Sequence, residues 1–227
     1  YQVKQLQESL TGRVAIDHLS ENSFGSLVPA RAYFHLKWAA DLALAFVVLP
    51  FALPLMAAIA VAIKLDSPGP VLFRQRRVGR AGVPFHMLKF RTMAHREAGG
   101  HIDEVITADG DPRITRVGAR LRKSRVDELP QIFNIIAGEM SWIGPRPEAE
   151  ALSAYYTGEI AFYRYRHVVR PGISGWAQVN QGHVASVDEV NAKLQYDFYY
   201  VKYFSAWLDI LITFRTIKTM MTGFGSR

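Results

Sequence analysis

The sequence contains no cysteine. A chain without thiols has no disulfide framework, no thiolate zinc site and no cysteine nucleophile. Several signatures of catalysis are missing too: there is no Walker loop, no dinucleotide-binding glycine motif, no HExxH and no GxSxG. The seven histidines are scattered without metal-ligand spacing, so His86, His167 and His183 are predicted to be structural or surface residues.

The overall composition is that of a folded protein with an excess of positive charge. The chain has 227 residues, of which 49% are hydrophobic and 21% charged, so it can form one or two domains with a sizeable core. Its formal net charge is +7. This excess predicts anionic partners, namely nucleic acid, a membrane surface with acidic lipids or phosphorylated substrates, and charge alone does not choose among them.

Charged residues are absent from one long apolar segment, residues 42–63, which reads LALAFVVLPFALPLMAAIAVAI. This segment exceeds the roughly 18 residues that indicate a membrane helix. It is also longer than the apolar core of a signal peptide, and no small-residue cleavage site follows it. The sequence therefore predicts a membrane protein.

Two features of this segment bear on its topology. Pro50 and Pro54 each remove a backbone donor in its middle, so they predict a break in the helix. Both flanks are basic, and the positive-inside rule then places both ends in the cytoplasm. A broken, re-entrant helix satisfies both features, but on these residues alone a single span remains open. The flanking cations are Arg31 and Lys37 before the segment, and Lys64, Arg74, Arg76, Arg77 and Arg80 after it.

The rest of the chain predicts a mostly α protein with one small β-hairpin, an α+β class. Two short runs, 71–78 and 83–90, are separated by glycines and predict the hairpin. Helices are predicted at 113–123, 127–137, 148–165 and 193–223, with a glycine-rich loop at 170–183. The domains expected are 1–30, a linker or the tail of a missing upstream domain; 31–65, the membrane helix; and 66–227, the remaining domain.

The last predicted helical segment is unusually aromatic. Seven of the twelve residues from Tyr196 to Trp207 are aromatic. Tyrosine and tryptophan concentrate at the boundary between bilayer and water, so interfacial amphipathic helices are predicted here. Ordinary core packing is the alternative that the sequence leaves open.

The adjacent carboxylates Asp127 and Glu128 stand between a basic stretch and an apolar one. Asp127 is predicted to be the N-cap of a helix that Gly138 ends. Adjacent side chains on a helix point about 100° apart, so the two carboxylates must take different roles. A helix N-terminus would stabilise an anion at Asp127, and Glu128 could hold a hard cation such as Mg²⁺. The apolar stripe predicted to be buried is Leu129, Ile132, Phe133 and Ile136.

Arginines near this pair point to phosphate chemistry. Arg122, Arg146 and Arg170 offer planar, bidentate donors for a phosphate group. A simple helix cap beside a basic face on acidic lipid is the alternative on these residues alone.

Four motifs stand out in order along the chain: KFRTM at 89–93, DELPQIFNIIAGEMSWIGPRPE at 127–148, RPGISGWAQVN at 170–180 and YDFYYVKYFSAWLDI at 196–210. Together they resemble the bacterial sugar transferase family, the monotopic polyprenyl-phosphate hexose-1-phosphate transferases. The resemblance runs from about residue 31 to 222. The membrane helix of this family is re-entrant and commonly breaks at a Ser-Pro pair, whereas this chain has Leu53-Pro54.

The resemblance implies transfer of a sugar 1-phosphate from a UDP-sugar to a polyprenyl (undecaprenyl) phosphate, with release of UMP. It places residues 66–227 as a catalytic domain on the cytoplasmic face of the bacterial inner membrane, at the first membrane step of glycan or exopolysaccharide biosynthesis. By resemblance, Asp127 is the nucleophile that forms a covalent aspartyl intermediate, and Glu128 belongs to a Mg²⁺ site. The charged positions that match family motifs, and are expected to bind substrate or phosphate, are Lys89, Arg122, Arg146, Arg170 and Asp197.

The expected partners are then the UDP-sugar, the polyprenyl phosphate and the lipid bilayer. No nucleic acid is expected, and a homodimer is compatible with the resemblance. The alternative from a different class is a membrane-anchored basic module that binds acidic lipid or nucleic acid without turnover.

Overall fold

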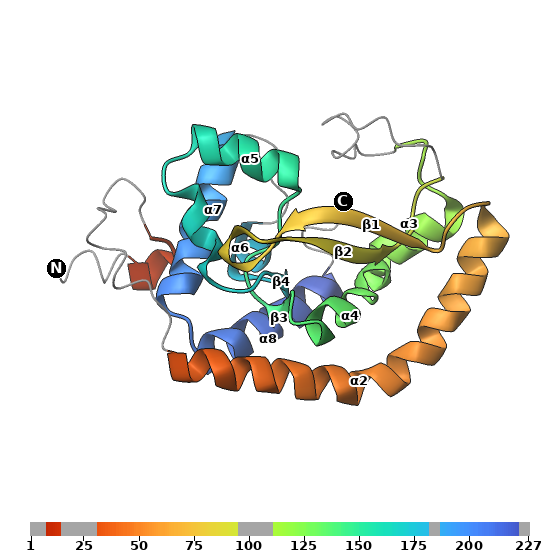
Figure 1. Ribbon diagram of the computed structural model, residues 1–227, viewed down its shortest axis with the longest axis horizontal. Helices are drawn as coiled ribbons and strands as arrows, with labels where there is room; N and C mark the ends of the chain where they lie inside the picture. The colour runs from red at the N-terminus through yellow and green to blue at the C-terminus, as the bar shows by residue number, and fades with distance from the viewer. Residues whose placement is uncertain (1–7, 15–30, 95–110, 182–186, 223–227) are drawn as a thin grey trace.

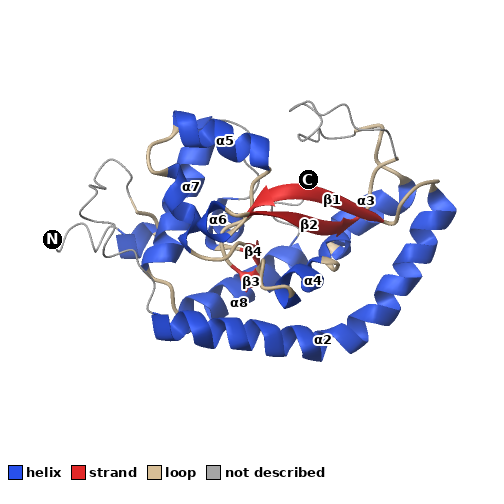
Figure 2. Cartoon of the chain, viewed as in Figure 1, coloured by secondary structure: helices blue, strands red, loops and turns tan. Residues whose placement is uncertain are grey.

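The computed structural model describes residues 8–14, 31–94, 111–181 and 187–222. Helices dominate the described part, with two pairs of short strands among them (Figure 2). This confirms the predicted mostly helical α+β class, while the second strand pair was not predicted. The elements are α2 (Arg31–Asp66), β1 (Leu72–Val78), 3-10 helix η3 (Arg80–Gly82), β2 (Pro84–Phe90), α3 (Arg116–Ser124), η5 (Val126–Glu128), α4 (Gln131–Ile136), β3 (Ser141–Ile143), α5 (Glu150–Glu159), η6 (Tyr163–Val168), β4 (Gly172–Ser174), α6 (Trp176–Gln181), α7 (Val187–Lys202) and α8 (Ala206–Thr222).

The apolar segment forms the long helix α2, which runs along one side of the molecule and curves around it (Figure 1). The helix curves but continues without interruption through Pro50 and Pro54, so the predicted break at these prolines is wrong. Among the described helices, α2 alone is long and apolar enough to cross a membrane by length and composition. Within its most apolar window 22% is buried by the rest of the molecule. Most of this apolar helix therefore lacks protein cover.

Lys37 is not a free flanking charge. Its Nζ lies 2.7 Å from Asp209 Oδ2 on α8 and 3.7 Å from Asp41 Oδ1 on α2. The hydroxyl of Tyr33 donates to the same Asp209 oxygen at 2.8 Å. The positive-inside argument therefore loses one of its charges, because a long-range ion pair neutralises Lys37 and joins the first half of α2 to α8.

The predicted hairpin is confirmed. Strands β1 and β2 are antiparallel, with Leu72 opposite Phe90 and Val78 opposite Pro84. Side chains at alternate positions share a face of a strand pair, so Arg77 and Lys89 lie on one face. Of these two cations, Lys89 pairs with Glu128 in the segment that follows α3.

The segment that follows α3 differs from the prediction. Arg125 adopts a left-handed φ of 55°, and the short turn η5 then carries Asp127 and Glu128 ahead of α4. The N-cap of α4 is Pro130. The prediction that Asp127 caps this helix is therefore wrong, because an extra 3-10 turn separates Asp127 from it.

The buried face of α4 also differs in part from the predicted stripe. Phe133 is 37% exposed, whereas Ile132 and Ile135 are buried against α2 and β2. Contacts with α2 and with β2, rather than helical periodicity alone, determine which positions of α4 are buried. The predicted end of the helix is confirmed, since Gly138 has a φ of 77° that glycine adopts readily.

The second strand pair joins segments far apart in the chain. Strand β3 pairs in parallel with β4, which lies inside the loop predicted at 170–183. A side chain at Gly172 would place its Cβ 2.1 Å from the Gly144 nitrogen, so only glycine allows this approach. The helix predicted at 148–165 is divided into α5 and η6.

The aromatic residues of α7 belong to the core. Tyr196, Phe198 and Tyr200 are 6%, 0% and 1% exposed. The prediction of an interfacial position is therefore wrong for α7, because α6 and η6 pack against this helix. Trp207 at the start of α8 is 73% exposed, and for α8 the interfacial position stays a prediction.

Residues 8–14, part of the predicted linker, pack against the body of the protein. The indole nitrogen of Trp176 donates to the Gly12 carbonyl at 2.8 Å, and the Val14 nitrogen donates to the Gln195 carbonyl at 3.1 Å. Val14 is 3% exposed. This short segment therefore contributes to the core around α6 and α7.

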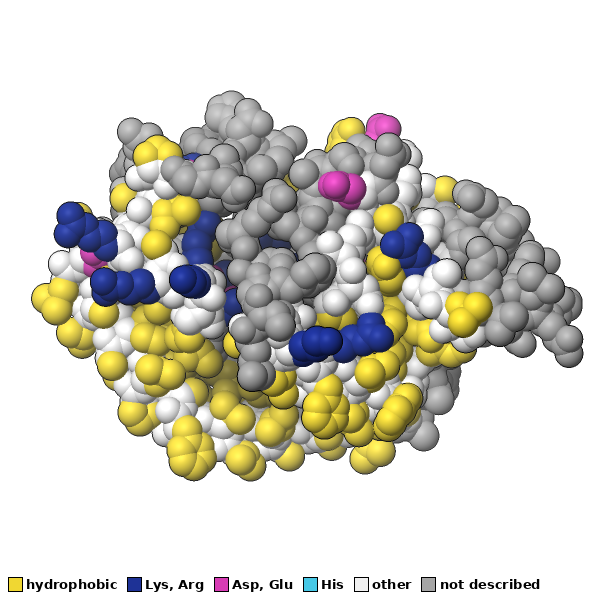
Figure 3. Space-filling model, turned by 180° about the vertical axis from the view of Figure 1, so that it is seen from behind, with side chains coloured by type: hydrophobic (Ala, Val, Ile, Leu, Met, Phe, Trp, Pro, Cys, Tyr) yellow, Lys and Arg dark blue, Asp and Glu magenta, His cyan; other side chains and the backbone are white. Residues whose placement is uncertain are grey.

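Exposed apolar side chains gather on one side of the molecule, and Lys and Arg side chains lie along the border of this surface (Figure 3). Contiguous exposed apolar surface marks a site of membrane or protein contact. We call it the apolar face; its residues are Leu36, Leu44, Phe46, Val47, Phe51, Leu53, Leu55, Val61 and Leu65 of α2 and Trp207, Ile210, Phe214, Ile217 and Met220 of α8.

Candidate active site

Glu128 is the centre of a buried ion-pair cluster. Lys89 Nζ and Arg146 Nη2 both donate to Glu128 Oε1, each at 2.9 Å. Lys89 comes from β2, and Arg146 comes from the loop after β3. Burial works to raise the pKa of Glu128, but the two cations outweigh it, so the pKa of this carboxyl lies well below its usual range. Glu128 is therefore a fixed anion that holds two cations in place.

Asp127 has a different environment from its neighbour. Among the residues that the structure describes, no donor or ion-pair partner lies within bonding distance of its carboxylate. Burial raises the pKa of Asp127, and the nearby charges of Lys89 and Arg146 only partly offset this effect. The pair thus combines one carboxylate that is bonded by two cations with one that makes no hydrogen bond or ion pair to the described residues.

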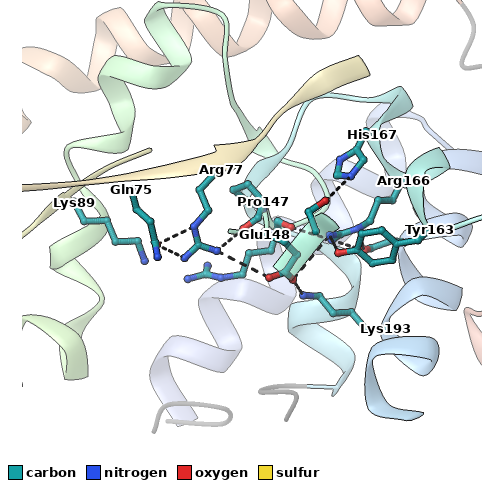
Figure 4. A network of polar contacts seen from close by, with 12 residues as sticks. Gln75, Arg77, Lys89, Pro147, Glu148, Tyr163, Arg166, His167 and Lys193 are labelled. Atoms are coloured by element: carbon teal, nitrogen blue, oxygen red, sulfur yellow. Dashed lines mark hydrogen bonds and ion pairs between the residues drawn. The ribbon is translucent and has the colours of Figure 1, made fainter. Parts of the chain in front are cut away.

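Two further arginines fix the loop that carries Arg146. Arg166 Nη2 donates to the Arg146 carbonyl at 2.9 Å, and Arg77 Nη1 donates to the Pro147 carbonyl at 2.8 Å. Figure 4 shows Arg77 and Arg166 approaching this loop from two sides. The position of the Arg146 guanidinium next to Glu128 is therefore set by its own backbone as well as by its ion pair.

Glu148 balances these cations. Its carboxylate bonds Lys193 and lies 3.9 Å from Arg166 Nη1 and 4.0 Å from Arg77 Nη1 (Figure 4). Burial works to raise the pKa of Glu148, but Lys193 and Arg166 lower it to about 2. A carboxylate that stays ionised in this buried position allows three cations to lie close to the Arg146 loop.

Residues 32–223 match the sequence model of a family described as "Bacterial sugar transferase". The chain belongs to the bacterial sugar transferase family. The match covers most of the chain and includes the buried cluster around Glu128, Asp127 beside it and most of α8.

The names of several relatives in this family state an activity. The chain is 52% identical over 229 residues to a UDP-N-acetylgalactosamine-undecaprenyl-phosphate N-acetylgalactosaminephosphotransferase of Aeromonas hydrophila, with 100% of this chain and 53% of the relative aligned. It is 48% identical to a UDP-glucose:undecaprenyl-phosphate glucose-1-phosphate transferase of Xanthomonas campestris pv. campestris (76% and 36% aligned), and 43% identical to one of Escherichia coli (strain K12) (80% and 39% aligned). The chain thus spans about a third to a half of the length of these relatives.

The residues predicted from the family motifs fall into two groups. Lys89, Arg146 and the carboxylate pair meet in one cluster. The Nε of Arg122 donates a hydrogen bond to Thr92 Oγ1 at 2.9 Å, and the positive charge of Arg122 works to lower the pKa of Asp127.

The other two predicted residues lie outside this cluster. Asp197 is 1% exposed and sits 2.7 Å from Arg166, behind the Arg146 loop. Arg170 donates its Nε to the Gly138 carbonyl at 2.8 Å, beside α2. Asp197 therefore pairs with the arginine that holds the Arg146 loop, and Arg170 lies at a separate location.

Four residues of the cluster were missed by sequence reasoning: Arg77, Glu148, Arg166 and Lys193. Glu148 ends the second quoted motif, which is a signal that could have identified it. The other three carry no local signal, because each contacts residues more than 15 positions away in the chain. Their role depends on the tertiary fold alone.

The acidic residues of the site offer few ligands for a metal. Within the described residues there is no group of three His, Cys, Asp or Glu that could hold an ion. Glu128 uses only Oε1 for its two cations, and its other oxygen accepts no hydrogen bond within the described part of the chain. Mg²⁺ is commonly held by one or two carboxylates together with substrate phosphates. The site therefore fits an ion that arrives with a diphosphate rather than one held by protein ligands alone.

Proposed function

We propose that this protein transfers a sugar 1-phosphate from a UDP-sugar to undecaprenyl phosphate, with release of UMP, at the cytoplasmic face of the bacterial inner membrane. This reaction would be a first membrane step of glycan or exopolysaccharide biosynthesis. The names of the relatives support these substrates.

One observation carries the proposal: the Asp127 carboxylate is free of hydrogen bonds among the described residues while its neighbour Glu128 holds Lys89 and Arg146 close by. A nucleophile needs an unoccupied carboxylate, and a phosphoryl transition state needs fixed positive charge next to it. A passive basic surface would need neither a buried anion nor a free carboxylate beside it. We therefore favour the enzyme over the lipid- or nucleic-acid-binding module.

The reaction proceeds in two displacements. A carboxylate oxygen of Asp127 attacks the phosphorus that bears the sugar, the bond from this phosphorus to the bridging oxygen breaks, and UMP leaves. The aspartyl-phosphosugar is an acyl phosphate, which is reactive enough for the second step. An oxygen of undecaprenyl phosphate then attacks the same phosphorus, the carboxylate leaves, and the product is the undecaprenyl diphosphosugar. Because the reaction has two steps, the two anionic substrates need not bind next to each other at the same time.

The cations of the cluster stabilise the charge of both displacements. Lys89 and Arg146 are held by Glu128, and Arg122 is held by Thr92, so none needs to reorganise when charge develops. Mg²⁺ bound with Glu128 would neutralise the diphosphate of the donor and favour departure of UMP.

The apolar face supports a membrane position for the site. Helices α2 and α8 expose large apolar side chains on one side, and Lys37 and Asp209 link these two helices. We propose that α2 enters and leaves the bilayer on the cytoplasmic side, so that both helices meet the same leaflet and the catalytic cluster stays in water.

The experiment that tests the function is a donor screen. Purified protein with undecaprenyl phosphate and UDP-N-acetylgalactosamine, UDP-glucose or UDP-galactose should release UMP and form one lipid-linked sugar. Omission of the lipid should limit release to about one UMP per enzyme, because the covalent intermediate cannot turn over. Absence of UMP release from every UDP-sugar tested would contradict the proposal.

The topology of α2 can be tested with cysteines in this cysteine-free chain. His35→Cys and Lys64→Cys are both exposed at opposite ends of the helix, whereas Lys37 and Asp66 bond other elements and are unsuitable. An impermeant thiol reagent should label both from the cytoplasmic side only. Phe51→Cys, at a position 79% exposed on the apolar face, should be protected from both sides. Labelling of the two ends from opposite sides would rule out the re-entrant helix.

Metal dependence is expected to require Glu128. Excess EDTA should lower UMP release by about 100-fold or more, the scale of losing one fixed charge-stabilising group, and added Mg²⁺ should restore it. Glu128→Gln keeps the shape of the side chain but should weaken the response to Mg²⁺. Full turnover in EDTA, or an unchanged Mg²⁺ requirement in Glu128→Gln, would exclude this role.

A further inference from the structure

Two arginines from distant parts of the chain meet on one aromatic ring near the start of α2. The guanidinium carbon of Arg80, in the hairpin turn, lies 4.0 Å from the centroid of the Phe34 ring. That of Arg170, after η6, lies 5.0 Å from the same centroid. The two guanidinium carbons are therefore within 9.0 Å of each other.

This pair has no carboxylate partner among the residues that the structure describes. Arg170 uses its Nε for the Gly138 carbonyl, and its terminal nitrogens have no bonded acceptor in the described part of the chain. The negative charge of Asp41 raises the pKa of Arg170, but the Asp41 carboxylate accepts a hydrogen bond from Ser141 and lies beside Lys37. Burial and the charge of Arg80 both lower the pKa of Arg170. An anion between the two arginines would relieve this repulsion.

The pair lies next to the apolar face. Trp38 is 41% exposed and its ring centroid lies 5.8 Å from the guanidinium carbon of Arg170, while Leu36 is 66% exposed. Tryptophan and arginine together favour the level of lipid headgroups, where an apolar body and a polar end are both satisfied. This step rests on the proposed docking of the apolar face on a membrane.

The pair is separate from the catalytic cluster. Arg80 and Arg170 lie against Phe34 of α2, and Arg170 also bonds the Gly138 carbonyl, whereas Glu128 bonds Lys89 and Arg146. An anion bound here would therefore have other partners than the phosphate that reacts at Asp127.

We propose that Arg80 and Arg170, with Trp38 beside them, bind the phosphate of an anionic bilayer phospholipid. The two guanidinium groups donate to the phosphodiester oxygens, and the acyl chains continue onto the apolar face. Because Arg80 belongs to the hairpin turn and both arginines lie against Phe34 of α2, one bound lipid would hold both elements at the membrane surface.

The proposal can be tested by lipid retention. Detergent-purified protein is titrated with phosphatidylglycerol or phosphatidylcholine, and the bound lipids are counted by native mass spectrometry. Arg80→Gln should weaken phosphatidylglycerol binding about fivefold, the equivalent of about 1 kcal/mol for one arginine at an anionic surface. Arg76→Gln is the matched control, because Arg76 is on the same hairpin but pairs with Glu150 of α5 at 3.1 Å. This control should bind as the unchanged protein does.

Each other outcome has a definite meaning. Equal losses in Arg80→Gln and Arg76→Gln would reduce the effect to general surface charge and overturn the site. A raised KM for undecaprenyl phosphate in Arg80→Gln, with phosphatidylglycerol binding unchanged, would assign the arginines to the acceptor and overturn it as well. The lipid count needs no turnover, so an inactive protein would contradict the proposed function without affecting this test.

Discussion

Asp127→Asn is expected to lower UMP release on the order of 10⁴-fold or more while the fold is retained. Loss of a covalent nucleophile removes the path through the intermediate, and effects of this scale follow removal of such groups in other enzymes. The fold should survive, because the Asp127 carboxylate makes no hydrogen bond or ion pair with the described residues. An amide of the same shape therefore leaves no broken contact behind.

The intermediate gives a second and independent measurement. Protein incubated with a UDP-sugar labelled in the sugar-bound phosphate, without lipid acceptor, should yield one labelled peptide that contains Asp127. Glu150→Gln is a suitable control, since this carboxylate is on the surface of α5 and pairs only with exposed Arg76 among the described residues. Substantial turnover by the asparagine variant, or ternary-complex kinetics with no labelled peptide, would overturn the assignment.

Asp197→Ala is expected to have the largest effect on stability. Its side chain and that of Arg166 are each 2% exposed and 2.7 Å apart, so the substitution leaves a buried arginine without its main partner. Removal of one member of such a pair costs about 3–5 kcal/mol. For a chain of this size the melting temperature in detergent should fall by about 10 °C. UMP release should fall too, since Arg166 also holds the Arg146 carbonyl.

A double variant separates the two roles of the pair. Arg166→Met with Asp197→Leu replaces the ions by apolar groups and should recover much of the stability. It should not recover turnover, because no donor remains for the Arg146 carbonyl. If instead Asp197→Asn keeps the melting temperature and raises only the KM for the UDP-sugar, Asp197 contacts substrate, as the family motif alone predicts.

The elements with strong local signals were predictable from the sequence. The hairpin is one case, because glycines at 79 and 82 separate two short runs and only a tight turn fits between them. The helix α2 is another, because 22 residues without charge have few alternatives. The end of α4 at Gly138 follows from the positive φ that this residue accepts.

Other features depended on packing that no local pattern reports. The aromatic run of α7 is compatible with an interface and with a core, and only its contacts with α6 and η6 decide for the core. Lys37 reads as a flanking charge until Asp209, 172 positions later, is seen to bind it. The insertion of η5 before α4 likewise depends on the left-handed Arg125.

The sequence by itself determined that this chain carries one helix long and apolar enough to cross a membrane, that it carries a small hairpin among helices and that Asp127 and Glu128 are adjacent. These properties follow from apolar length, turn residues and covalent order, which act over short distances in the chain. Only the tertiary structure decided how the two carboxylates differ. Glu128 accepts hydrogen bonds from Lys89 and Arg146, which lie 39 and 18 positions away in the chain. The carboxylate of Asp127, one residue earlier, has no hydrogen-bond donor among the described residues. Such a difference is set by the meeting of distant segments, and that meeting is settled by the packing of the whole fold.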